Sequence, residues 1–305
     1  MDLLPLRYFQ LVARYEHVGK AAAELRVAQP SVSRTIARLE SELGVPLFDR
    51  QGKRIRLNRF GAAYLRRVDR ALAELDDGRR ELADAAGLEY GSVAIAVETM
   101  LTLTELLPDY RARYPEVDVR LFQATADGMQ RQLQRGEVDL CIASQPLAGP
   151  SLRAVELLRE EVLLAVPPAH RLADRETVTL AELEGEPFIT TRTGHWQRAL
   201  ADRLFTEAGL RLTVVCEGDE PGATGDLIGA GLGVGLVPAM SRETTTRSSP
   251  VVHLRLDAPG CYRSLSLVWR QDAYLSVAAQ RFSELAVAHF RRFASYEGAG
   301  RAGTS

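Results

Sequence analysis

Four neighbouring side chains near the start of this 305-residue chain have the chemistry needed to read nucleic acid: Gln29, Ser31, Ser33 and Arg34. A glutamine amide can form a bidentate hydrogen-bond pair with adenine, hydroxyl groups adapt to several bases, and arginine reaches guanine or a backbone phosphate. If one helix presents these groups together on its outer face, that face can enter the major groove of double-stranded DNA.

Three short helices are predicted to position this face. The first spans about 5–15, on an apolar stripe at helical spacing, and the second is a short alanine-rich helix over 20–25 that follows Gly19. Pro30 suits the first turn of the third helix, and Gly44 ends it. The buried face of the third helix is predicted to consist of residues spaced i, i+4, i+7 and i+11: Val32, Ile36, Leu39 and Leu43.

A basic hairpin is predicted to follow the third helix over residues 47–57. Phe48, Ile55 and Leu57 can face the core, and Gly52 permits a tight turn, so the basic side chains between them project as a β-wing that contacts phosphates. An ordinary three-helix core with basic solvated surfaces would account for the apolar stripes but not for the order of these features. The predicted DNA-binding residues are Lys20, Gln29, Pro30, Ser31, Ser33, Arg34, Arg38, Arg50, Lys53, Arg54 and Arg56.

The distribution of charge along the chain also indicates that the N-terminal region, residues 1–60, binds a polyanion. The chain has a net charge of −2, but residues 1–60 hold 11 Lys and Arg against 6 Asp and Glu, whereas the remainder holds 27 against 34. No apolar run is long enough to span a membrane, and Asp2, Arg7 and Arg14 interrupt any candidate signal peptide. We therefore expect a cytoplasmic protein that neither spans nor binds a membrane.

A long charged helix is predicted between the head and the rest of the chain. It begins after Asn58, a suitable N-cap, and continues to about residue 88. A narrow apolar stripe along it is typical of a coiled-coil dimerisation seam, although the same stripe could pack against the chain's own body. The seam residues are Leu65, Val68, Leu72, Leu75 and Leu82.

Strands alternate with helices from Gly91 onward, which predicts an α/β body with largely parallel sheets. The predicted strands are 92–97, 117–123, 138–144, 162–166, 187–190, 212–218, 234–238 and 265–269. We find no G-x-S-x-G, P-loop or H-E-x-x-H motif, and the glycine run 231–235 precedes a strand rather than a helix. The three cysteines lack metal spacing and are expected to be buried thiols. No catalytic residue, metal ligand or cofactor is predicted.

The N-terminal run from Leu6 to Gly61 resembles the signature of LysR-type transcriptional regulators. Two positions depart from that pattern: Glu16-His17-Val18-Gly19 replaces the usual Gly-Ser-aromatic-Ser, and Ala28 replaces a serine before the Gln-Pro pair. The matching elements are Leu6…Phe9…Val12, Ala21-Ala22…Leu25, Gln29-Pro30-Ser31-Val32-Ser33, Leu39-Glu40…Leu43-Gly44, Leu47-Phe48…Arg50 and Leu57…Gly61.

This resemblance implies a domain plan. Residues 1–58 would form an all-α winged helix-turn-helix domain and 59–88 a dimerising linker helix. Residues 89–293 would form a two-lobed α/β effector domain similar to periplasmic binding proteins, with lobe I over about 91–164 and 266–293 and lobe II over about 165–265, before a disordered tail at 294–305. The implied partners are a near-palindromic promoter or operator, a second copy in a homodimer that assembles into a homotetramer, and RNA polymerase.

The resemblance also places a small-molecule effector between the two lobes, at four loops. Helix N-termini and hydroxyl groups favour an anion such as a carboxylate there, and Arg192 and His195 would reinforce that preference. Four acidic residues would oppose it, so the charge of the ligand stays open: Glu98, Asp127, Asp219 and Glu220. The predicted effector-binding residues are Thr99, Met100, Leu101, Thr102, Thr125, Asp127, Thr191, Arg192, Gly194, His195 and Asp219. The alternatives are an architectural DNA-binding protein without a ligand and a DNA-tethered enzyme.

Overall fold

A computed structural model describes residues 3–51, 54–87, 91–220, 223–242 and 250–294. The chain divides into two units, which are described separately below. The N-terminal unit comprises residues 1–79 with 134–137, and the second unit comprises residues 80–133 and 138–305. The predicted tail at 294–305 lies outside the described residues except for its first position.

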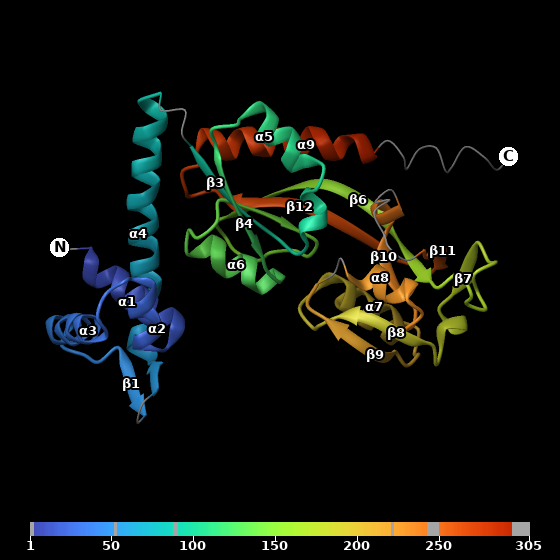
Figure 1. Ribbon diagram of the computed structural model, residues 1–305, viewed down its shortest axis with the longest axis horizontal. Helices are drawn as coiled ribbons and strands as arrows, with labels where there is room; N and C mark the ends of the chain where they lie inside the picture. Colours follow the sequence, from blue (N-terminus) through green and yellow to red (C-terminus); the bar gives the residue numbers. More distant parts are fainter. Residues whose placement is uncertain (1–2, 52–53, 88–90, 221–222, 243–249, 295–305) are drawn as a thin grey trace. The chain divides into compact units, whose positions relative to one another are not determined.

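The N-terminal unit is built on three helices and a hairpin (Figure 1). Its elements are α1 (Leu4–Tyr15), α2 (Val18–Glu24), α3 (Gln29–Leu43), β1 (Phe48–Gln51), β2 (Arg54–Leu57) and the first part of α4 (Arg59–Ala85). Pro30 lies in the first turn of α3, and Gly44 ends the helix with a left-handed φ of 73°. The helices therefore form where the apolar periodicity predicted them. One detail differs, because Leu43 is 38% exposed and the buried stripe of α3 ends at Leu39.

Side-chain hydrogen bonds to the backbone fasten the hairpin to the helices. Glu40 Oε1 accepts from the N–H of Leu47 at 2.7 Å, and Glu16 Oε1 accepts from the N–H of Leu57 at 2.8 Å. Asn58 caps α4 as predicted, since its Oδ1 accepts from the N–H groups of residues 60 and 61, each at 2.9 Å. Both strands of the wing are thus anchored at their helix-proximal ends.

The apolar stripe of α4 divides into two parts. Val68 and Leu72 are each 3% exposed, and with Leu65 they pack into the core of the N-terminal unit. Leu75 and Leu82 are 45% and 72% exposed. The first part of the predicted seam therefore serves the chain's own core, and the second part is an unpartnered apolar surface within this chain.

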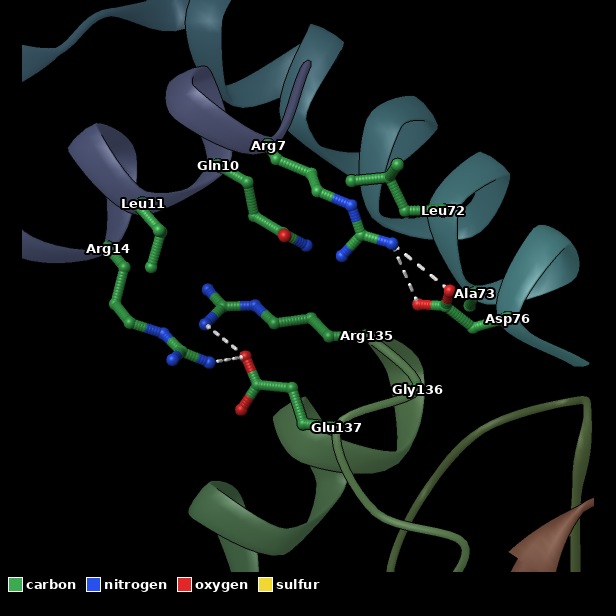
Figure 2. Close-up of a pocket in the computed structure, with 10 residues that line it drawn as sticks. All are labelled: Arg7, Gln10, Leu11, Arg14, Leu72, Ala73, Asp76, Arg135, Gly136 and Glu137. Atoms are coloured by element: carbon green, nitrogen blue, oxygen red, sulfur yellow. Dashed lines mark hydrogen bonds and ion pairs between the residues drawn. The ribbon is translucent and has the colours of Figure 1, made fainter. Parts of the chain in front are cut away.

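A small polar pocket of about 150 Å³ also belongs to the N-terminal unit (Figure 2). Gln10 Nε2 donates to the buried Asp69 at 2.8 Å beside it, and burial raises the pKa of that carboxyl above its usual value. Three lining arginines pair with three carboxylates: Arg7 with Asp76 at 3.1 Å, Arg135 with Asp69 at 3.5 Å, and Arg14 with Glu137. Because each guanidinium already has a carboxylate partner, we interpret this network as structural.

The second unit is an α/β body. Its helices are α5 (Leu106–Arg113), α6 (Ala126–Gln134), α7 (Trp196–Glu207), α8 (Thr224–Gly229) and α9 (Val277–Ala294), with short 3-10 turns at Met100–Leu103, Ala181–Leu183 and Ala239–Arg242. Its strands are β3 (Ser92–Val97), β4 (Asp118–Gln123), β5 (Leu140–Ala143), β6 (Leu152–Val166), β7 (Thr177–Thr179), β8 (Pro187–Thr191), β9 (Thr213–Gly218), β10 (Gly235–Pro238), β11 (Val252–Asp257) and β12 (Tyr262–Arg270).

The sheets are mixed, which corrects the prediction of largely parallel strands. β4, β3 and β5 run parallel, as do β8 and β9. However, β12 is antiparallel to both β5 and β6, and β10 and β11 are antiparallel to β6. The two long strands explain the difference: β6 pairs first with β12 and then with β10 and β11, so one strand serves both lobes.

Each lobe has apolar cores on both sides of its sheet. In β3, Val93, Ile95 and Val97 face the core that includes α5 and α9, while Ala94 and Ala96 face the core that includes α6. Figure 1 shows α5 and α9 on one side of these strands and α6 on the other. In β6, residues 162, 164 and 166 likewise face the core with α7, and residues 163 and 165 face the core with α8. This alternation is the pattern of a sheet that is covered on both faces.

Candidate functional sites

The outer face at the start of α3 is the candidate DNA-binding surface. Gln29, Pro30 and Arg34 are exposed, and Ser31 and Ser33 are half-buried at the flanks, above a stripe led by the fully buried Val32. Arg34 Nε donates to the carbonyl of Pro30 at 3.3 Å, which holds the guanidinium along the first turn of the helix. Polar groups thus cover the solvent side of the turn that an α-helix would present to base edges.

The other predicted DNA-binding residues differ in how much the structure describes. Lys20, Arg38 and Arg56 are exposed, and Arg38 forms a solvent-exposed ion pair with Glu42 at 3.5 Å. Arg50 and Arg54 lie on the paired strands of the wing, but their side chains are outside the described part of the structure. Lys53, like Gly52, lies outside the described residues.

In the second unit, the predicted effector loops meet in a cluster of buried polar side chains. Four of the predicted side chains are buried, with exposed fractions between 1% and 8%: Thr99, Thr102, Thr191 and His195. Thr99 Oγ1 donates to Glu220 Oε1 at 3.2 Å, and its oxygen accepts from the N–H of residue 101 at 3.3 Å. The first loop is therefore bound to the loop that follows β9.

Gln145 joins the remaining loops of this cluster. Its Nε2 lies within hydrogen-bond distance of Glu98 Oε1, at 3.2 Å, and of the carbonyl of Gly194, at 3.1 Å. A Cβ on Gly194 would lie 3.6 Å from Thr125 Cγ2, and its φ of 100° is a conformation that favours glycine. The structure thus brings the loops at residues 98–102, 125, 191–195 and 220 together, as predicted.

Five predicted effector residues, Gly194 among them, lie at the exposed margin rather than among the buried groups. Leu101 is 42% exposed and Asp127 is exposed in the first turn of α6. Arg192 and Asp219 are both exposed and pair with each other, with Nε and Oδ1 3.2 Å apart. The guanidinium of Arg192 is thereby partly neutralised by a carboxylate of the same chain. Met100 is half-buried against the lobe I core.

The most deeply buried acid of the cluster, Glu98, is absent from the predicted effector-binding set. It is 2% exposed, and burial raises the pKa of its carboxyl above the usual value despite hydrogen bonds from Ser144 and Gln145 and the nearby His195. Glu98 is predicted at this site only as a charge that would oppose an anion, although its position at the end of a parallel strand is typical of residues that line sites in α/β folds. Gln123 and Gln145 were also missed, because single glutamines carry no distinctive spacing.

A buried ion pair supports this cluster. Arg263 Nε donates to Glu160 Oε1 at 2.9 Å, and their side chains are 2% and 7% exposed. Arg263 Cζ also lies 4.8 Å from the centre of the Trp196 ring at the start of α7, and Glu160 Oε2 accepts from the N–H of Met240 at 2.7 Å. One arginine and one glutamate thus connect four elements through direct contacts: β6, β12, α7 and the turn at Ala239–Arg242.

Two of the three cysteines of the second unit are buried as expected, and the third, Cys216, is not. Cys141 and Cys261 are buried, and burial raises the pKa of both thiols, that of Cys261 to about 12. Cys216 is half-buried. Among the described residues, no group of three His, Cys, Asp or Glu side chains could hold a metal ion, and no helix is long and apolar enough to cross a membrane.

Two family profiles cover most of the chain. The bacterial regulatory helix-turn-helix protein, lysR family, matches residues 3–62, and the LysR substrate binding domain matches residues 86–291. A helix-turn-helix head followed by an effector-binding α/β domain defines a class of DNA-binding transcriptional regulators. The chain belongs to the LysR family of these regulators.

Individual relatives agree over nearly the whole length. The chain is 34% identical over 293 residues to the uncharacterized HTH-type transcriptional regulator YybE of Bacillus subtilis (strain 168), covering 95% of this chain and 99% of that protein. It is also similar to the crystal structure of CbnR, a LysR family transcriptional regulator, with a TM-score of 0.66, 25% identity and 96% and 99% of the two chains covered. Full-length CbnR in complex with its target DNA gives a TM-score of 0.53 at 26% identity and covers 95% and 99%.

Proposed function

We propose that this regulator binds a promoter through the outer face of α3 and the wing, and that a small molecule bound at the polar cluster of the second unit alters that binding. The observation that carries the DNA half is the exposed Gln29, Pro30 and Arg34 above a wholly apolar buried stripe. The complex of CbnR with its target DNA supports it. Since the DNA is in the cytoplasm, we infer that the protein works there.

We propose further that two copies associate through α4. Val68 and Leu72 are buried in the core of the N-terminal unit, whereas Leu75 and Leu82 are exposed. The apolar seam available to a second copy is therefore shorter than the sequence predicted. A dimer with twofold symmetry would read two half-sites of a near-palindromic operator. Pairing of two such dimers into a tetramer, and contact with RNA polymerase, remain expectations from family resemblance.

The effector half of the proposal depends on the buried polar cluster. Thr191, His195 and Glu98 each keep a side-chain atom that has no hydrogen-bond partner among the described residues. Buried polar atoms of this kind are uncommon in proteins and mark places where a ligand can supply the partner. Because they lie in a regulator and no acid–base or nucleophile pairing motif accompanies them, we propose binding rather than catalysis.

Replacing Arg34 with alanine should weaken binding to promoter DNA and reduce its dependence on salt. A lost phosphate contact lowers the slope of log K against log salt concentration by about 0.9. The measurement is fluorescence anisotropy of a labelled duplex from upstream of the gene, titrated with full-length protein at several salt concentrations. The control is Arg211→Ala, an exposed arginine of the second unit that removes the same charge. Equal slopes and affinities for the two variants would remove Arg34 from the interface.

A further inference from the structure

The charge that faces the ligand at the polar cluster is set by Glu98. Its side chain is 2% exposed, Oε1 accepts a hydrogen bond from Gln145, and Ser144 also acts on the carboxyl group as a hydrogen-bond donor. Oε2 has no partner of good hydrogen-bond geometry among the described residues. An ionised carboxylate that is withdrawn from water and left without a counter-charge is unfavourable. Burial also raises the pKa of Glu98, which is the expected response to that environment.

The cations near Glu98 already have anionic partners. Arg263 is bound to Glu160, with Nε and Oε1 2.9 Å apart, and Arg192 is bound to Asp219. The imidazole of His195, which acts electrostatically on Glu98, is the remaining basic group in this part of the described structure. A ligand carboxylate at this cluster would therefore compete with Glu160 for the buried Arg263, or with Asp219 for the exposed Arg192.

A second carboxylate, that of Glu220, adds negative charge near Glu98. Gln123 Nε2 lies 3.2 Å from the carbonyl oxygen of Glu98 and 2.6 Å from Glu220 Oε2, so it links the two acidic residues. Glu220 also accepts a hydrogen bond from Thr99. Gln123 therefore connects the backbone of the buried Glu98 to the exposed carboxylate of Glu220, which adds negative charge at the margin of the cluster.

Two unpartnered buried atoms elsewhere in the cluster are compatible with a hydrogen-bond donor on the ligand. Thr191 Oγ1 and His195 Nδ1 have no hydrogen-bond partner among the described residues, and both atoms can accept a hydrogen bond from an N–H group. Thr191 and His195 are 1% and 5% exposed, so solvent does not readily replace such a donor. The indole N–H of Trp196 is likewise unpartnered and would bind a ligand acceptor.

We propose that the effector of this regulator carries a protonated nitrogen, as an amine, amidine or guanidine, that donates hydrogen bonds to the free oxygen of Glu98. This inference rests on the proposed function, because it assigns a ligand class to the same cluster. It departs from the carboxylate that helix N-termini and hydroxyl groups alone would favour. A carboxylate ligand would instead have to bind beside the buried Glu98 carboxyl and compete with Asp219 for Arg192.

The test compares probes of matched shape and different charge. Full-length protein is heated with benzylamine, benzamidine or agmatine, and in parallel with benzyl alcohol or benzoate, at equal millimolar concentrations. At least one nitrogen cation should raise the Tm above the shift given by benzoate. In the Glu98→Gln variant the Kd for that cation should be about tenfold weaker or more, as expected for losing a charge-assisted hydrogen bond. The Glu116→Gln variant, at an exposed position, should keep the wild-type Kd.

Three results would overturn the inference: a larger shift with benzoate than with any cation, an unchanged Kd in Glu98→Gln, or no shift with any cation. A wild-type urea midpoint by tryptophan fluorescence shows that the second unit of the Glu98→Gln variant is folded, since both tryptophans lie in that unit. If benzoate stabilises the protein and changes its affinity for promoter DNA, the ligand class is wrong and the proposed function stands. If probes of neither charge change the Tm or the DNA affinity, the effector half of the proposed function also fails.

Discussion

Replacing Arg263 with alanine is expected to lower the free energy of unfolding of the second unit by about 3–5 kcal/mol, the range for breaking a buried ion pair. The loss is large because Glu160, with a side chain 7% exposed, would keep a buried charge without its cation. The packing of Arg263 on Trp196 would disappear as well. Both tryptophans, Trp196 and Trp269, lie in the second unit, so urea unfolding followed by tryptophan fluorescence reports on this unit.

The control for this prediction is Arg255→Ala. Arg255 pairs with Glu161 at 3.1 Å on the neighbouring strands, but its side chain is 66% exposed. Exposed ion pairs contribute about 0–1 kcal/mol, so this variant should unfold near the wild-type urea midpoint. Equal midpoints for Arg263→Ala and Arg255→Ala would show that the buried pair does not hold the lobes' strands together.

Replacing Gly61 with alanine is expected to destabilise the N-terminal unit by about 3 kcal/mol, the upper part of the usual range for overpacking. A Cβ at this position would lie 2.1 Å from the backbone oxygen of Leu47 and 2.6 Å from Leu57 Cδ1. Neither α4 nor the start of the wing can yield without moving the other, since Asn58 binds both Pro46 and the first turn of α4. Promoter affinity should fall with the loss of the wing's position.

Gly78→Ala is the matched control on the same helix. A Cβ there meets nothing within 4 Å, so the change should stabilise α4 by about 1 kcal/mol through helix propensity alone. Hydrogen exchange of the amides of α1–α3, followed by mass spectrometry, measures both effects. Protection that falls in Gly61→Ala and not in Gly78→Ala supports the close approach of α4 to Leu47. Unchanged protection in Gly61→Ala would contradict it.

The fold of the N-terminal unit could be predicted because its helix-capping residues and its apolar periodicity indicate the same helices. Pro30 and Gly44 mark the ends of α3, and Asn58 marks the start of α4, through capping chemistry that acts over a few residues. The seam was less predictable, since Leu65, Val68 and Leu72 have the same spacing whether they meet a partner helix or the chain's own core. Periodicity identifies an apolar face but not what covers it.

The sheet and the ligand site depended on pairings that lie far apart in the sequence. The apolar run 162–166 predicted only the end of β6, because the first third of the strand, Leu152–Glu156, alternates poorly and is largely exposed. The antiparallel pairing with β12 therefore escaped prediction. Glu98 and Gln145 are brought together from different strands, and the burial of Glu98 could not be read from either local pattern.

The central claim is that ligand binding at the polar cluster changes the affinity of α3 for DNA. The direct measurement is the Kd of full-length protein for its promoter duplex, with and without a compound that raises its Tm. We predict a change of at least about fivefold, the lower end for coupled sites, and its loss in a Thr99→Ala, Thr102→Ala variant that still binds the duplex. A Kd that stays constant for every stabilising compound would contradict the account, because linkage requires a coupled ligand to change DNA affinity.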